Sequence, residues 1–205
     1  MTPHYWTEAT RSLASGDAVL ETLIDRFEGL TLGSRGDAFT TIARAIVGQQ
    51  LSVKAAQSVW NRVCDEVRSF TPAALVEADA GRLRACGLSN RKVIYLRDLA
   101  ARIGTGRLDL AALSALDDEG VIAQLTQVKG IGRWTAEMFL IFHMARPDVF
   151  PLDDVGLQRA LRNCYNRGRP LSVTRMRKLG AAWAPWRSVA TWYLWRSLDP
   201  VVVQY

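Results

Sequence analysis

The 205-residue chain has few cysteines and lacks any long hydrophobic run. Cys64, Cys86 and Cys164 are odd in number, widely spaced and without a CxxC pair. This pattern disfavours a disulfide framework or a zinc site and indicates a reducing compartment. No apolar run approaches the roughly 20 residues that cross a bilayer, and the N-terminus lacks the basic and apolar regions of a secretory signal. We therefore expect a cytoplasmic protein with no membrane association.

Strand signals are scarce too, and helical periodicity dominates the chain. Over residues 37–47, apolar side chains recur at spacings of three and four, which gives one buried stripe. The short apolar run Val201–Val203 is interpreted as a tail. The pattern predicts an all-α protein of roughly ten helices joined by short turns. Residues typical of helix starts occur at Ser52, Thr71-Pro72, Ser89 and Ser114, the last followed by an acidic first turn.

Basic residues outnumber acidic ones, with 26 Lys and Arg against 20 Asp and Glu, for a net charge of +6. This excess favours a nucleic-acid partner, although many basic proteins bind nothing acidic. The length fits one large domain or two small lobes, and the 49% hydrophobic content excludes bulk disorder. Four of the seven tryptophans lie close together and indicate either core packing or an interface: Trp183, Trp186, Trp192 and Trp195.

The segment Val128–Gly132 lies between two helical patterns and has glycines on either side of Ile131. Glycine permits a tight turn and the close approach of another backbone. The turn ends at the start of a helix, where outward-pointing N–H groups and the helix dipole favour an anion. The pattern therefore predicts a phosphate-binding helix–turn–helix, to which Lys129 and Arg133 add positive charge. A plain turn between antiparallel helices, with glycine as a C-cap, stays open as the alternative.

Two adjacent carboxylates, Asp153 and Asp154, follow Pro151 at the start of a further helix. An aspartate at such a position commonly caps the helix. Capping accounts for one of the two but poorly for both, because like charges side by side repel each other. One carboxylate can therefore cap the helix while the other faces a cleft. A carboxylate there stays ionised near neutral pH and can act as a base or stabilise a cation.

Five segments resemble, in order, motifs of the helix-hairpin-helix DNA glycosylase superfamily. The resemblance is greatest to its alkylation-repair branch, 3-methyladenine DNA glycosylase II. Together the segments span about residues 38–198, most of the chain. They are the Gln-Gln junction Ile46–Ser52, the turn Gly87–Lys92, the hairpin Leu125–Met138, the aspartate segment Pro151–Leu157 and the aromatic helix Trp183–Trp195.

This resemblance implies a two-lobed, all-α helix-hairpin-helix glycosylase fold with the active site in the cleft between the lobes. Residues 1–205 would form a single catalytic unit. About residues 30–130 would form a central helical lobe, with the hairpin at 117–145. About residues 1–30 and 146–205 would form the second helical lobe.

The resemblance also implies roles for individual residues. Asp154 matches the catalytic carboxylate, and Asp153 is then its cap-like neighbour. Trp134 and Trp195 match the aromatic walls of the base pocket, where Met138 stands at a position that is aromatic in some relatives. Three further residues match the substrate site, the second or third as a wedge in the duplex: Gln49, Gln50 and Leu51. The DNA-binding positions are Gly130, Gly132 and Thr135, through their backbone N–H groups, with Lys129 and Arg133.

No redox cofactor or catalytic metal is implied. No cysteine follows Cys164, so the four-cysteine tail of the iron–sulfur branch is absent from the sequence. Trp134 occupies the position of the nucleophilic lysine in lyase-active branches, and we therefore expect no AP-lyase activity. A monovalent cation, Na⁺ or K⁺, matches a hairpin site formed by the backbone carbonyls of Thr126, Val128 and Ile131.

The implied function is base-excision repair of damaged double-stranded DNA by a monomeric, monofunctional glycosylase, on the nucleoid if the source is bacterial. The enzyme would flip an alkylated purine, of the 3-methyladenine or 7-methylguanine type, out of the duplex and hydrolyse its N-glycosidic bond. Two alternatives stay open: a non-catalytic helix-hairpin-helix DNA-binding protein, and a glycosylase for oxidised or mismatched bases. The residues do not rank the alkylated or deaminated bases as substrates.

Overall fold

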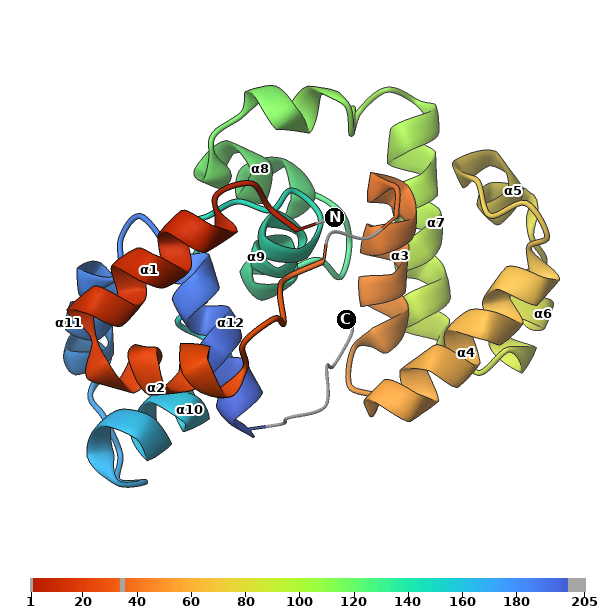
Figure 1. Ribbon diagram of the computed structural model, residues 1–205. Coiled ribbons are helices and arrows are strands. Elements are labelled where there is room, and N and C mark those ends of the chain that lie inside the picture. The colour runs from red at the N-terminus through yellow and green to blue at the C-terminus, as the bar shows by residue number, and fades with distance from the viewer. Residues whose placement is uncertain (1, 34–35, 199–205) are drawn as a thin grey trace. The chain divides into compact units, whose positions relative to one another are not determined.

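Helices account for all regular structure in the part of the chain that the computed structural model describes, residues 2–33 and 36–198. These residues form twelve α-helices and one 3-10 helix and contain no strand (Figure 1). The all-α prediction is confirmed. Residues 201–203, interpreted above as a tail, lie outside the described residues. None of the described helices is long and apolar enough to cross a membrane.

The chain divides into two compact units. We call residues 2–33 and 140–198 the terminal unit, and residues 36–139 the central unit. Helices of the terminal unit are α1 (Trp6–Gly16), α2 (Ala18–Arg26), α10 (Val155–Asn166), α11 (Val173–Ala182) and α12 (Arg187–Leu198). Those of the central unit are α3 (Ala38–Gly48), α4 (Val53–Glu66), α5 (Pro72–Glu77), α6 (Ala80–Ala85), α7 (Asn90–Gly104), the 3-10 helix Ala112–Ala115 and α8 (Asp118–Leu125). Helix α9 (Arg133–Phe142) begins in the central unit and ends in the terminal one.

Helix α12 forms the centre of the terminal unit. Its buried residues lie on every side of the helix, which is typical of a helix enclosed by others. Helices α1, α2 and α10 pack against it (Figure 1). Trp192 of α12 meets Trp6 of α1 edge to face, with the ring centroids 5.2 Å apart. Trp192 and Trp183 are therefore core residues, whereas Trp195 is half-buried.

Helices α1 and α2 are not among those predicted from the sequence. They meet at Asp17, whose side chain caps α2 by accepting the N–H groups of Val19 and Leu20 at 3.0 and 3.2 Å. The same carboxylate accepts hydrogen bonds from the Tyr165 hydroxyl at 2.8 Å and the Trp183 indole at 3.0 Å. These bonds attach the first two helices to the C-terminal part of the unit, through long-range contacts that local periodicity does not reveal.

Buried tyrosines make the terminal unit sensitive to high pH. Burial raises the pKa of Tyr5 to about 12 and also raises the pKa of Tyr165 and Tyr193. Because the folded protein holds these phenols neutral, their contribution to stability is complete below the unfolded pKa of about 10 and is lost as the pH rises towards the folded values. We expect the melting temperature to fall by several degrees between about pH 9 and pH 11. Tyr5→Phe should make this fall shallower, and an unchanged melting temperature across the range would contradict the expectation.

In the central unit, helix α7 contacts α3, α5 and α6, and α3 also packs against α4 (Figure 1). Three predicted N-caps are confirmed, because each side chain accepts a backbone N–H at the start of its helix: Ser52, Thr71 and Ser89. The predicted helix start at Ser114 is wrong. Ser114 lies in the 3-10 helix, and Asp117 caps α8 by accepting the Gly120 N–H at 2.8 Å. A carboxylate is the better partner at this N-terminus, because its charge also suits the helix dipole.

Candidate functional site

Helices α8 and α9 form a hairpin around the glycine-containing turn. The Val128 N–H donates to the Leu125 carbonyl, and the Ile131 N–H donates to the Val128 carbonyl, both at 3.1 Å. The Ile131 side chain is buried, as expected of the apolar residue between the two glycines. The predicted helix–turn–helix is present, and we call residues 126–132 the hairpin turn.

Gly130 lies against the Tyr95 ring of helix α7. Its φ of +80° falls in the left-handed region. A Cβ atom built on it would lie 2.1 Å from Cδ2 and 2.4 Å from Cε2 of Tyr95. No side chain fits between this backbone and the tyrosine ring, so glycine is required both for the conformation and for the close approach.

Asp98, one turn of α7 after Tyr95, holds Lys129, the residue of the hairpin turn that precedes Gly130. Its Oδ2 accepts the Lys129 N–H at 2.9 Å and the Arg102 Nε–H at 2.9 Å. Burial alone would raise the pKa of Asp98, but these two hydrogen bonds and the neighbouring positive charges lower it. Helix α7 therefore supports the hairpin turn through an ionised carboxylate as well as through an aromatic ring.

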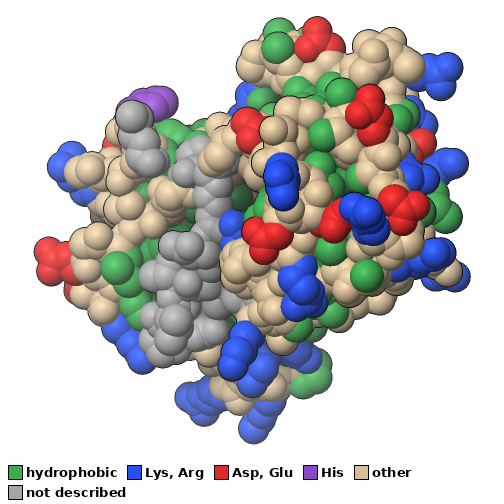
Figure 2. Space-filling model, turned by 90° about the vertical axis from the view of Figure 1, so that its right-hand side faces the viewer, with side chains coloured by type: hydrophobic (Ala, Val, Ile, Leu, Met, Phe, Trp, Pro, Cys, Tyr) green, Lys and Arg blue, Asp and Glu red, His purple; other side chains and the backbone are tan. Residues whose placement is uncertain are grey.

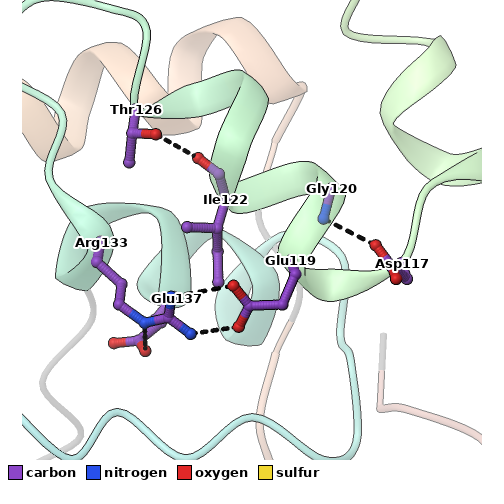
Figure 3. A network of polar contacts seen from close by, with 7 residues as sticks. All are labelled: Asp117, Glu119, Gly120, Ile122, Thr126, Arg133 and Glu137. Carbon is purple, nitrogen blue, oxygen red and sulfur yellow. Dashed lines mark hydrogen bonds and ion pairs between the residues drawn. The ribbon is translucent and has the colours of Figure 1, made fainter.

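Figure 3 shows how Arg133 links the two helices of the hairpin. Its guanidinium donates to both carboxylate oxygens of Glu119 in α8 and, through Nε at 3.1 Å, to Glu137 one turn along α9. The bond to Glu119 is the largest factor that raises the pKa of Arg133. Much of the positive charge that the sequence offers at this position is therefore balanced within the hairpin.

The carbonyl groups predicted to bind a monovalent cation lie in or beside the hairpin turn: Thr126, Val128 and Ile131. The Val128 oxygen accepts the Ile131 N–H at 3.1 Å. A carbonyl oxygen has two lone pairs, so this bond does not exclude a cation. Within residues 2–33 and 36–198, no group of three or more His, Cys, Asp and Glu side chains could hold a metal ion. A cation in the turn would depend on backbone oxygens.

The Gln49–Leu51 segment, which we call the wedge turn, follows helix α3 in the central unit. The Gln49 side chain donates from Nε2 to the Gly130 carbonyl at 2.8 Å, so the wedge turn touches the hairpin turn directly. Gln50 has a φ of +59°, a left-handed conformation that is uncommon for a residue other than glycine. Leu51 is exposed. The structure thus brings two separately predicted motifs together.

Asp154 is the N-cap of helix α10 in the terminal unit. Its Oδ1 accepts the Leu157 N–H at 2.5 Å and the Trp195 Nε1–H at 2.8 Å. Asp153 is exposed and does not cap the helix. The prediction that Asp153 is the cap-like neighbour is therefore wrong. A single carboxylate both caps α10 and meets the indole, because Oδ1 can accept two donors at once.

The Trp195 ring is fixed from two sides. It stacks on Phe142, with the ring centroids 5.7 Å apart and the planes 13° from parallel. On another side lies the aspartate segment: a Cβ atom on Gly156 would lie 3.0 Å from Oδ1 of Asp154 and 3.4 Å from Cδ1 of the indole. Sequence reasoning missed both Phe142 and the Trp195–Asp154 bond. Phe142 could have been found from its spacing, because it follows Met138 by four residues on helix α9.

The other predicted residues of α9 differ in exposure. Trp134, in the first turn, is 37% exposed, whereas Met138 is buried. The Thr135 side chain is also buried. A phosphate contact at Thr135 would thus use the backbone N–H, and the first N–H groups of a helix have no acceptor within the helix itself.

The hairpin formed by α8 and α9 and the aspartate that caps α10 place this protein in the class of helix-hairpin-helix DNA-repair proteins. The chain matches the model of the "HhH-GPD superfamily base excision DNA repair protein" over residues 43–185, and it belongs to this superfamily. It is 34% identical over 165 residues to DNA-3-methyladenine glycosylase 1 of Schizosaccharomyces pombe, covering 78% of this chain and 72% of that protein.

Solved structures of similar proteins have the same fold. The crystal structure of a DNA-3-methyladenine glycosidase from Bacillus halodurans superposes with a TM-score of 0.83 at 35% identity, covering 96% of this chain and 92% of that one. A Schizosaccharomyces pombe 3-methyladenine DNA glycosylase in complex with abasic DNA superposes with a TM-score of 0.77 at 29% identity, covering 97% and 99%.

Proposed function

We propose that this chain is a monofunctional DNA glycosylase that hydrolyses the N-glycosidic bond of alkylated purines after base flipping. The observation that carries the proposal is Asp154, whose Oδ1 is held by the Leu157 N–H and the Trp195 indole. The names of the similar proteins, DNA-3-methyladenine glycosylases, support the choice of substrate.

Excision requires a cationic transition state, and a carboxylate is suited to stabilise it. Alkylation at a ring nitrogen makes the base a good leaving group. As the C1′–N bond breaks, its electron pair departs with the base and the sugar becomes oxocarbenium-like. Asp154 stabilises that positive charge and orients the water whose oxygen bonds to C1′, and the proton of the water passes to the carboxylate or to solvent. No step uses a redox cofactor or a catalytic metal.

The remaining proposed roles concern DNA and the flipped base. The hairpin turn holds phosphate through the N–H groups of Gly130, Gly132 and Thr135. The carbonyls of the turn would hold a monovalent cation, which would supply positive charge beside the phosphate. These phosphate contacts do not depend on the base sequence, which suits an enzyme whose lesions occur at any position in DNA. Trp134 and Trp195 stack on the base, and Gln50 or Leu51 fills the gap that the base leaves in the duplex.

Release of free base from methylated duplex DNA tests the proposal. We expect methylated purines to appear in solution and the strand to stay intact until alkali or an abasic endonuclease is added. A non-catalytic DNA-binding protein would release no base. A lyase would cleave the strand and be trapped by borohydride, but an indole, Trp134, stands at the position of the family's nucleophilic lysine. Preferential release of oxidised or mismatched bases would favour the other branch of the superfamily.

We further propose that the protein acts as a monomer on damaged double-stranded DNA. A cytoplasmic location, at the nucleoid in a bacterium, would give it access to this substrate. On the face drawn in Figure 2, Lys and Arg side chains alternate with Asp and Glu over much of the surface, and several basic side chains gather at its lower end. On this face, contact with the phosphate backbone would depend on individual basic residues rather than on a continuous basic surface.

The two basic residues of the hairpin should contribute unequally to DNA binding. Lys129→Ala should reduce the slope of log affinity against log salt by about 1, because one phosphate contact is lost. Arg133→Ala should change the slope less, since Glu119 and Glu137 already balance its charge. Affinities for undamaged duplex between low and moderate salt would measure both. Equal changes would mean that Arg133 leaves its carboxylates on binding.

Trp134→Ala should discriminate between cationic and neutral substrates. A desolvated cation–π contact contributes about 2 kcal/mol, so excision of 7-methylguanine should fall roughly 10- to 30-fold more than excision of hypoxanthine. Because Trp134 is substantially exposed, the melting temperature should change little. Equal losses of excision rate on the two bases would mean that Trp134 only forms part of the pocket wall and makes no cation–π contact.

A further inference from the structure

Lys92 of helix α7 connects this helix to the wedge turn. Its Nζ donates to the Val47 carbonyl at 2.8 Å and to the Gln49 carbonyl at 2.7 Å. Both oxygens lie at the C-terminal end of α3, where carbonyl groups lack partners within the helix and the dipole favours a cation. The side chain is half-buried, and this burial lowers the pKa of Lys92. Lysine is rarely buried in proteins unless it is paired, and here the two carbonyls are its partners.

The segment that Lys92 holds is unusual in two respects. Gln50 adopts a left-handed φ of +59° without being glycine, and Leu51 presents an apolar side chain to solvent. A left-handed residue of this kind persists only where its surroundings determine the backbone. The two bonds from Lys92 contribute to that determination, because they fix carbonyls on the N-terminal side of Gln50. The Leu51 N–H, which donates to the Gly48 carbonyl at 3.1 Å, holds the other side.

The same helix also fixes the hairpin turn. Tyr95 packs against Gly130, and Asp98 accepts the Lys129 N–H. Lys92, Tyr95 and Asp98 follow at intervals of three, so they lie along one side of α7. The Gln49–Gly130 bond closes the connection between the two turns. Helix α7 thereby holds the wedge turn and the hairpin turn at a set distance from each other.

We propose that Lys92 is a positioning residue for base excision. It keeps the wedge turn in register with the phosphate-binding hairpin, so that Gln50 and Leu51 enter the duplex when the damaged nucleotide leaves it. The inference rests on the proposed glycosylase function. Lys92 itself acts through the backbone of the wedge turn and touches neither the base nor the sugar.

The test compares Lys92→Met, which keeps an unbranched side chain as far as Cε but has no ammonium group, with Lys92→Arg and with Leu99→Val. Leu99 is a fully buried residue seven positions further along the same helix, so its variant lowers stability and removes none of the hydrogen bonds to the wedge turn. Three quantities are measured at a temperature where all variants are folded: affinity for undamaged duplex, the fluorescence of 2-aminopurine beside an abasic analogue, and the single-turnover rate on methylated duplex at saturating enzyme.

We expect Lys92→Met to keep the affinity for undamaged duplex, to lose the fluorescence increase that reports unstacking, and to excise about 10- to 100-fold more slowly. Lys92→Arg should restore much of both signals, and Leu99→Val should behave as the wild type does. Wild-type unstacking and excision by Lys92→Met would overturn the proposal, as would equal losses in Leu99→Val. If the wild type releases no base at all, the glycosylase function fails, and the fluorescence still decides the role of Lys92.

Discussion

Asp154→Asn should nearly abolish base excision while DNA binding persists. The amide cannot stabilise the oxocarbenium-like sugar or accept a proton from water, and a group with these roles contributes about 10²- to 10⁴-fold to the rate. The fold should survive, because asparagine is also a good N-cap and its oxygen can accept the N–H groups of Leu157 and Trp195. Binding to duplex DNA should be unchanged or tighter, since one negative charge is removed.

Single-turnover release of methylated purine, measured with the affinity for the same duplex, decides this prediction. Asp153→Asn is the matched control, because the neighbouring residue is exposed and caps nothing. It should excise at close to the wild-type rate. If Asp153→Asn were the inactive variant and Asp154→Asn the active one, the wrong carboxylate would have been chosen. Excision by Asp154→Asn within about tenfold of the wild type would contradict the mechanism.

Gly130→Ala should be the most damaging substitution in the hairpin. The new Cβ would lie 2.1 Å from the Tyr95 ring, on a backbone whose φ of +80° already disfavours a side chain. The left-handed conformation costs about 1–2 kcal/mol, and overpacking costs about 1–3 kcal/mol more. We therefore expect a loss of about 2–5 kcal/mol, a melting temperature lower by roughly 5–20 °C, and weaker binding to DNA.

Gly132→Ala is the matched control for stability. A Cβ at Gly132 meets nothing within 4 Å, and its φ is not in the left-handed region. Its melting temperature should equal that of the wild type, whereas its DNA affinity should fall if the backbone here approaches phosphate. Thermal unfolding of both variants provides the comparison. Equal stability of the two would mean that Tyr95 moves aside at little cost.

Local signals predicted much of the helical architecture. The caps at Ser52, Thr71 and Ser89 depend on hydrogen bonds that span three residues, so the sequence alone reveals them. The prediction that a helix starts at Ser114 was wrong because several residues suited to capping lie close together there, and Asp117 is the one that caps α8. Helices α1 and α2 were not predicted, although Asp17 is a local N-cap of the same kind. The bonds from Tyr165 and Trp183 to Asp17, which attach these helices to the rest of the terminal unit, are long-range and could not be predicted from a local pattern.

Whether the role of a candidate site residue could be predicted from sequence depended on how far along the chain its partners lie. The glycines of the hairpin turn could be identified from sequence, since a tight turn before a helix is a local requirement. The sequence could not decide which of two adjacent aspartates meets an indole, because the bond between Asp154 and Trp195 joins residues 41 positions apart.

By itself the sequence determined the helical class, several helix starts and the superfamily motifs, because caps, glycine turns and periodicity act over a few residues. Only the tertiary structure decided which residues the side chains of these motifs contact. It placed the ring of Tyr95 under Gly130, joined Lys92 to carbonyls 45 and 43 positions away, and paired Arg133 with Glu119. Such contacts arise when helices pack, and packing depends on the shapes of all the side chains between them rather than on any local pattern.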